Sequence, residues 1–109
     1  IGTNSGLGIR CEAYGPVTIG ENVMMGPEVV CYTQNHKHGL GETFIEQGYE
    51  ETQPVSIGNN VWIGRRAMFL QGASIGNNVV VAAGAVVAKQ FGDNVIIGGV
   101  PARIIGKIE

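Results

Sequence analysis

Apolar side chains recur at every sixth position through most of this sequence, with one interruption near the middle. The positions are Ile1, Leu7, Ala13, Ile19, Met25 and Cys31, then Ile57, Ile63, Phe69, Ile75, Val81 and Val87. Apolar residues make up 44% of the chain, so twelve matches in succession are not a chance result. The next residue is glycine in seven of these twelve hexads, where composition predicts about two. The fifth residue of the hexad is small or β-branched in all but two hexads, which carry Asn35 and Phe91.

A period of six excludes an amphipathic helix, whose apolar face recurs every 3.6 residues. Triplets such as residues 17–19 and 61–63 alternate inward and outward, as short strands do. Gly-Asn-Asn at 58–60 and 76–78 would turn the chain at corners, because these residues tolerate left-handed backbone angles. The pattern predicts an all-β parallel β-helix of hexapeptide repeats over residues 1–109, as one domain. Because Ile1 begins in mid-repeat, we expect a further segment before it.

The interruption predicts a protruding loop. Ile57 follows Cys31 by 26 positions, and if residues 51–56 form the next hexad, with Val55 inward, residues 37–50 are an insertion. A loop of this length is more often functional than not. After Val87 the rhythm fades, and we expect a short C-terminal tail with two isoleucines at 104–105 to cap the last coil.

Charge and composition narrow the classes of function. The net charge of −2 gives no reason to expect nucleic acid or an anionic membrane as a partner. Residues 1–53 hold two bases and seven acids, and residues 54–109 hold five bases and two acids, so an anionic ligand is expected against the second part. Two cysteines make no secreted disulfide framework, and no apolar run reaches the ~20 residues that span a bilayer. We therefore expect a cytoplasmic protein.

The sixth position of each hexad should point outward, and it is often apolar. It holds His36 and Trp62 together with Met24, Val30, Met68, Val80 and Val86. So many apolar residues on an outer face predict that another subunit covers it, in a cyclic homo-oligomer. Interface packing and ligand lining remain equal alternatives for Trp62.

His36 is the leading candidate for catalysis. An unperturbed imidazole has a pKa of about 6.5 and can take a proton from a hydroxyl or amine at neutral pH. A solvated loop histidine is the alternative, but His36 stands where a rigid coil passes into a long insertion. His38 is interpreted as a surface or substrate-facing residue. Two histidines alone make a poor metal site, and both cysteines fall on inward columns, which argues against a cysteine nucleophile.

The sequence resembles the hexapeptide-repeat acyltransferases, and within them the maltose, galactoside and capsular-polysaccharide O-acetyltransferases. The resemblance covers essentially the whole chain. The segments that carry it are Val17-Thr18-Ile19-Gly20-Glu21-Asn22-Val23, Asn35-His36, Ile57-Gly58-Asn59-Asn60-Val61-Trp62-Ile63-Gly64, Gly84-Ala85-Val86-Val87-Ala88-Lys89 and Gly99-Val100-Pro101-Ala102-Arg103.

The resemblance implies a left-handed β-helix, a homotrimer with active sites between subunits, and acetyl-CoA as the acyl donor, with no metal. It implies that His36 is the general base and that Glu12 and Asn35 contact the acceptor. It also implies a CoA site formed by Trp62, Gly64, Arg65, Ala83, Ala88, Lys89 and Arg103. The acceptor is expected to be a hydroxyl of a sugar. An amine acceptor, a metal-dependent hydratase similar to the γ-type carbonic anhydrases, and a non-catalytic solenoid are the alternatives.

Overall fold

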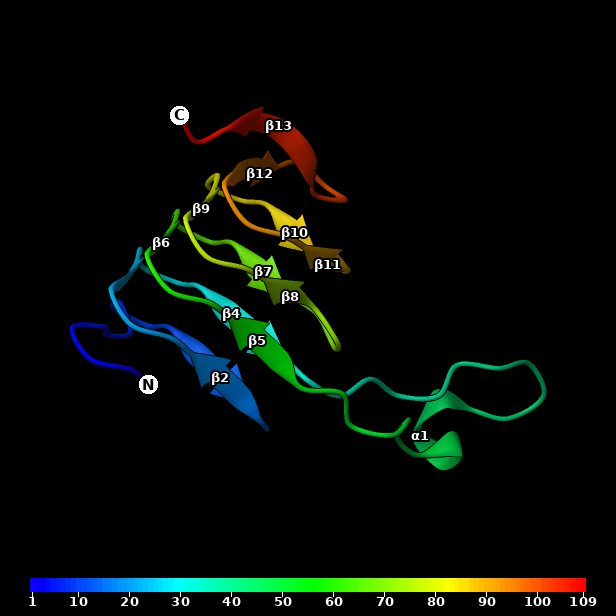
Figure 1. Cartoon of the computed structure of the whole chain (residues 1–109). Helices are drawn as coiled ribbons and strands as arrows, with labels where there is room; N and C mark the ends of the chain where they lie inside the picture. The colour runs from blue at the N-terminus through cyan, green and yellow to red at the C-terminus, as the bar shows by residue number, and fades with distance from the viewer.

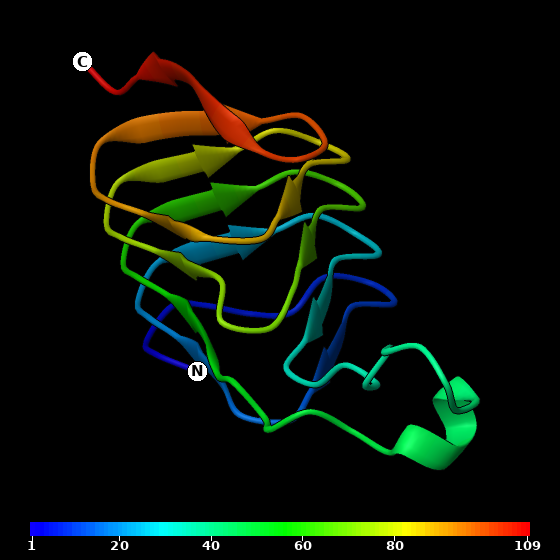
Figure 2. The same ribbon diagram turned by 90° about the vertical axis from the view of Figure 1, so that its right-hand side faces the viewer.

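The computed structural model describes residues 1–109 and shows a left-handed parallel β-helix of triangular cross-section (Figures 1 and 2). Its strands form three sheets, one on each side of the triangle, and every pairing is parallel except that of the last two strands. Sheet 1 contains β1 (Glu12–Tyr14), β4 (Val30–Tyr32), β7 (Met68–Phe69) and β10 (Val86–Val87). Sheet 2 contains β2 (Val17–Ile19), β5 (Val55–Ile57), β8 (Ser74–Ile75) and β11 (Gln90–Phe91). Sheet 3 contains β3 (Val23–Met25), β6 (Val61–Ile63), β9 (Val79–Val81), β12 (Val95–Gly98) and β13 (Arg103–Lys107).

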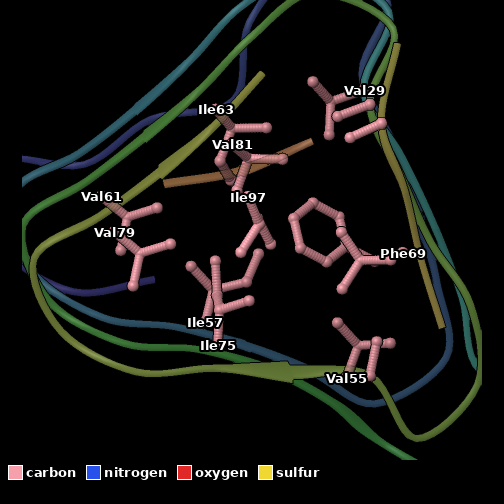
Figure 3. Close-up of a cluster of buried hydrophobic side chains, with 14 of the residues drawn as sticks. Val29, Val55, Ile57, Val61, Ile63, Phe69, Ile75, Val79, Val81 and Ile97 are labelled. Atoms are coloured by element: carbon pink, nitrogen blue, oxygen red, sulfur yellow. The ribbon is translucent and has the colours of Figure 1, made fainter. Parts of the chain in front are cut away.

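The strand register explains the six-residue period. Ile57 pairs with Ile75, and Val61 with Val79, so each regular coil takes 18 residues and each hexad supplies one side of the triangle. The first and the fifth residue of the hexad both reach the core in the regular coils. Ile63 and Phe69 at the first position and Val79 at the fifth are almost fully buried (Figure 3). Burying one such side chain is worth roughly 1.5–3 kcal/mol. The first coil differs, because Ile1 and Leu7 are exposed there.

The corners divide two tasks between asparagine and glycine. The left-handed backbone angles that the sequence suggested belong to the second asparagine of each corner, Asn60 and Asn78, with φ of 55° and 56°. Their side chains join adjacent coils, since Asn60 Nδ2 donates to Asn78 Oδ1 at 2.9 Å. Gly58 is needed for a different reason: a Cβ there would collide with the carbonyl group of Gly76 in the next coil.

The chain leaves the helix between β4 and β5 over a longer stretch than the sequence predicted. Ile57 pairs with Ile19, 38 positions earlier, against 18 in a regular coil. The excursion therefore covers about residues 33–54, not only 37–50, because the histidine segment has also left the coil. It contains an unpredicted helical turn, α1 (Phe44–Gln47), whose N-cap Thr43 accepts a bond from the Glu46 amide. Figure 2 shows α1 standing away from the coils.

The repeat does not fade after Val87, as the sequence had suggested, but becomes shorter. Phe91 is buried and pairs with Ile75, 16 positions earlier, because the corner at Ala88 and Lys89 has lost two residues. The C-terminal tail then returns antiparallel to β12 as β13. It extends the edge of sheet 3, and its two isoleucines at 104–105 are 54% and 61% exposed rather than buried over the core. None of the helical segments is long and apolar enough to span a bilayer.

Candidate active site

His36 lies where the chain leaves the corner between sheets 1 and 2, in the first arm of the excursion. It was expected as an outward residue on a coil, but it forms an isolated antiparallel bridge with Tyr49 in the returning arm. The imidazole stacks on the Tyr49 ring, with centroids 4.3 Å apart and an interplanar angle of 29°. Both side chains are exposed, so the imidazole is held but remains accessible to a substrate.

Two further side chains shape the arms around His36. The Nδ1 atom of His38 lies 3.1 Å from the carbonyl oxygen of His36. Gln47 closes the loop: its Nε2 donates to the carbonyls of Gly39 at 2.9 Å and Glu42 at 2.8 Å. The Gly39 amide donates back to Gln47 Oε1 at 2.7 Å. The excursion is therefore a closed structure built on internal hydrogen bonds, and only Thr33, at its start, is buried.

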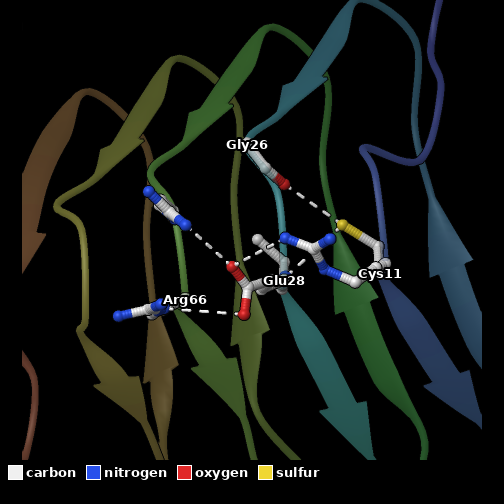
Figure 4. A network of polar contacts seen from close by, with 7 residues as sticks. Cys11, Gly26, Glu28 and Arg66 are labelled. Atoms are coloured by element: carbon white, nitrogen blue, oxygen red, sulfur yellow. Dashed lines mark hydrogen bonds and ion pairs between the residues drawn. The ribbon is translucent and has the colours of Figure 1, made fainter.

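A basic cluster occupies the corner between sheets 3 and 1, which we call the arginine corner (Arg10, Glu28, Arg65 and Arg66). Glu28 accepts from Arg65 at 3.0 Å and also pairs with Arg10 at 3.4 Å and with Arg66 at 3.6 Å (Figure 4). The hydrogen bond from Arg65, followed by the charges of Arg66 and Arg10, holds the pKa of Glu28 below its usual range. Three guanidinium groups share one carboxylate, so the cluster keeps an excess of positive charge that suits an anionic ligand.

Gly64 and Ala83 stack at the same corner in successive coils. A Cβ on Gly64 would lie 2.6 Å from the backbone nitrogen of Ala83, so only glycine fits this position. Ala83 is itself exposed. Arg103 pairs with Gly98 at the end of β12, beside this corner.

Trp62 stands on the outer face of sheet 3. It is 56% exposed and lies in register between Met24 and Val80 on the neighbouring strands. These three side chains line a shallow hollow of about 300 Å³ together with Ile108 and corner asparagines that include Asn60 and Asn78. The geometry fits both alternatives that the sequence left open, a ligand or a subunit against Trp62.

Glu12 lies on the outer face of sheet 1, between the two corners. The Tyr14 hydroxyl donates to its carboxylate at 2.7 Å, and this bond and the charge of Glu12 raise the pKa of Tyr14. Tyr14 stacks on Tyr32 with centroids 5.1 Å apart. Glu12 also lines a hollow of about 390 Å³ with Arg10, Arg66 and Met68 among others. A ligand bound here would meet the carboxylate of Glu12 and guanidinium groups.

The predicted site residues form two groups that do not meet within one chain. Asn35 and His36 lie at one edge of sheet 1, and Ala88 and Lys89 lie at the same edge two coils further along. The other group, at the opposite edge and on sheet 3, consists of Trp62, Gly64, Arg65, Ala83 and Arg103. One side of the triangle is a hexad long, up to about 20 Å in extended chain, too far for a direct contact.

Sequence reasoning missed three residues that shape these groups. Tyr49 and Gln47 lie inside the insertion, where no period indicates which side chains meet. Glu28 occupies a corner with a left-handed φ of 62°, and its spacing of 18 from Arg10 was the one available signal. No cluster of three or more His, Cys, Asp or Glu side chains could hold a metal ion.

Comparisons with known proteins agree with the fold. Residues 54–89 match the family described as bacterial transferase hexapeptide (six repeats). The galactoside O-acetyltransferase of Escherichia coli is 39% identical over 92 residues, which cover 84% of this chain and 44% of that enzyme. An Escherichia coli protein assigned as a lipopolysaccharide biosynthesis O-acetyl transferase is 33% identical, over 94% of this chain and 67% of that protein.

A solved structure shows the same architecture. A galactoside acetyltransferase in complex with coenzyme A superposes with a TM-score of 0.81 and 33% identity, over 94% of this chain and 55% of that one. The chain thus spans about half the length of several of the proteins that it matches.

Proposed function

The chain belongs to the bacterial hexapeptide-repeat transferases, and from this premise we propose that it transfers an acetyl group from acetyl-CoA to a hydroxyl group of a sugar. The relatives named galactoside O-acetyltransferase and the related structure with bound coenzyme A support the donor and the kind of acceptor. The observation that carries the proposal is the exposed imidazole of His36, held at the base of a closed loop at the rim of the helix.

In the proposed reaction His36 acts as general base. A ring nitrogen of His36 takes the proton of the acceptor hydroxyl as its oxygen attacks the thioester carbonyl carbon. The C–O bond forms, the C–S bond breaks, and the CoA thiolate leaves and regains a proton from the imidazolium. A positioned base supplies about 10² to 10⁴ in rate. Asn35 and Glu12 are proposed to contact the acceptor. Asn35 directly precedes His36 in the chain, and Glu12 lines the hollow on sheet 1.

The CoA side of the site is proposed at the arginine corner and along sheet 3. The exposed backbone of Ala83 is proposed to bond a pantetheine amide, with half-buried Gly64 next to it in the preceding coil and Trp62 alongside. Arg65 and Arg103 are proposed to bond the phosphates, and Ala88 and Lys89 to complete the site from the corner at which His36 lies. A phosphate bonded to a cation with water excluded contributes roughly 1.5–3 kcal/mol.

A second copy of the chain is needed to assemble this site. His36 and the arginine corner lie at opposite ends of the strands of sheet 1, which supports a site in which the CoA bound along sheet 3 of one copy faces the His36 of another. We propose a cyclic homotrimer with its axis parallel to the helix, in which each interface forms one active site.

Free cysteines at 11 and 31 suit a reducing compartment, and we propose that the protein is cytoplasmic.

The test is a CoA-release assay with a panel of sugars and amino sugars. Thiol should appear with at least one hydroxyl acceptor, and His36→Ala should lose a factor of about 10² to 10⁴ in kcat. His38→Ala is the matched control, because it removes the other imidazole; we expect it to keep more than about a tenth of the rate. A His36→Ala rate equal to wild type would reject the base, and transfer only to amines would reject the hydroxyl acceptor.

A further inference from the structure

We propose that Tyr49 is the positioning residue that holds the imidazole of His36 in its catalytic orientation. The inference rests on the proposed function, because it assigns a role in the reaction of that site. The exposed loop supplies no buried pocket for the imidazole, and no hydrogen bond within the chain engages either of its ring nitrogens. The Tyr49 ring is the one side chain seen to fix its plane.

The backbone places these two side chains as close together as an antiparallel pair allows. The Lys37 amide donates to the Gly48 carbonyl at 2.9 Å, and the Glu50 amide donates to the Asn35 carbonyl at 2.8 Å. These two bonds flank His36 and Tyr49, which therefore form a non-hydrogen-bonded pair. In such pairs the Cα atoms are about 4.5 Å apart and the side chains are at their closest. The ring stacking is thus a direct consequence of the register of the two arms.

The register is itself locked from the far end of the loop. Gln47 lies two residues before Tyr49 and ties the Gly39 and Glu42 carbonyls together. A slip by one residue would break the Gln47 bonds and turn Tyr49 to the other face of the pair. The loop therefore fixes the register that places the Tyr49 ring against the His36 imidazole.

A purely structural role does not explain this contact. Tyr49 is 56% exposed and is not part of the hydrophobic core, so the helix does not depend on its burial. A general base normally has a third group that orients it. Here a stacked ring fixes the plane of the imidazole and leaves both nitrogens free, one for the acceptor proton and one for a partner outside this chain. Small misplacements of a base can cost about 10²-fold in rate.

The test compares three substitutions. Tyr49→Phe keeps the ring, Tyr49→Leu keeps apolar bulk without a ring, and Tyr49→Ala removes both. We expect Tyr49→Phe to retain kcat within about twofold, and Tyr49→Leu and Tyr49→Ala to lose about 10-fold to 10²-fold in kcat, with KM for acetyl-CoA unchanged. Equal kcat for Tyr49→Leu and wild type overturns the proposal, as does a loss confined to KM.

Proton NMR of the two histidines gives a readout that does not depend on activity. A ring stacked on an imidazole shifts the imidazole proton resonances upfield, and His36→Ala assigns which resonances are those of His36. Tyr49→Leu should move the His36 resonances toward random-coil positions, Tyr49→Phe should not, and the His38 resonances serve as internal reference. Unmoved His36 resonances in Tyr49→Leu overturn the proposal. If no acetyl transfer is found but the resonances move, the proposed function fails while the positioning of His36 by Tyr49 stands.

Discussion

The thiol of Cys31 is the buried titratable group whose environment most changes its chemistry. Cys31 is 2% exposed on the inner face of β4, and its burial raises the pKa of the thiol to about 11. In the unfolded chain the same thiol ionises near pH 9. Between pH 9 and 11 the thiol therefore stays protonated in the folded state but ionises in the unfolded chain. The contribution of Cys31 to the free energy of unfolding is complete below pH 9 and is lost as the pH rises through 11.

We predict that this loss can be isolated with Cys31→Ala. The free energy of unfolding of wild type minus that of the variant should fall by up to about 2–3 kcal/mol between pH 8 and 11, measured by urea unfolding. Cys11→Ala provides the control, since Cys11 is only half-buried and its Sγ bonds the Gly26 carbonyl at 3.1 Å. A pH-independent difference for Cys31→Ala would contradict the assignment.

Single residues of the site were predictable to the extent that they carry rare chemistry. His36 could be proposed because it is one of two histidines and stands at the break of a strict period. Tyr49 could not, because its partner is fixed by the closure of the loop, and loop closure depends on Gln47 bonds that no period encodes. The sequence also placed Arg65 in the basic half of the chain, but not the Glu28 carboxylate that binds it from another coil.

At the scale of elements, the stacking of coils depends on places where two backbones nearly touch. Gly58 is one of them, since an added Cβ would strike the backbone carbonyl of Gly76 and neither backbone can yield without opening the coil. We predict that Gly58→Ala lowers the free energy of unfolding by about 1–3 kcal/mol or more, as overpacking does. Chemical denaturation followed by far-UV circular dichroism measures this loss.

Gly92→Ala is the matched control for that experiment. A Cβ at Gly92 would meet nothing within 4 Å, and its φ is not in the left-handed region. The added methyl group there should change stability by less than about 1 kcal/mol, and can raise it by restricting the unfolded chain. If both alanine variants unfolded at the same denaturant concentration, close approach would not be the reason for glycine at 58.

Elements that repeat were predictable, and elements that depart from the repeat were not. The positions of the strands and of the core could be predicted from the columns that contain Ile57, Ile63 and Phe69. Each residue of a column packs against its equivalent in the next coil, so its environment repeats. The 38-residue coil and the 16-residue coil break that equivalence at one corner, so their ends depend on tertiary pairing of Ile57 with Ile19 and of Phe91 with Ile75. The reversal into β13 likewise requires the edge of β12 as partner.

At the scale of the whole molecule, the outer faces of sheets 2 and 3 differ in polarity. Sheet 2 presents Thr18, Ser56, Ser74 and Gln90 in register. The equivalent column of sheet 3 consists of Met24, Trp62, Val80 and Ile96. Met24 and Trp62 are exposed in this apolar column, and we therefore expect sheet 3 to be the face that meets another molecule, whereas sheet 2 can remain in water. The group with Trp62 lies on and beside the apolar sheet 3, and the group with His36 lies at the corner between sheets 1 and 2. If another copy packs on sheet 3, we expect its His36 to complete the active site there.

Shared sites make a sharp prediction for mixed oligomers. His36→Ala should inactivate the base side, and the double variant Trp62→Ala with Arg65→Ala should inactivate the CoA side, each as a homo-oligomer. The two chains can be co-expressed with different tags and purified over both affinity columns, so that every oligomer contains both. In a cyclic trimer of two chains of one kind and one of the other, one interface in three joins an intact His36 to an intact CoA side.

Such mixed trimers should recover about one third of the wild-type kcat per trimer. Recovery no greater than in the separate homo-oligomers would show that each active site lies within one chain, and a dimer by light scattering would reject the threefold arrangement.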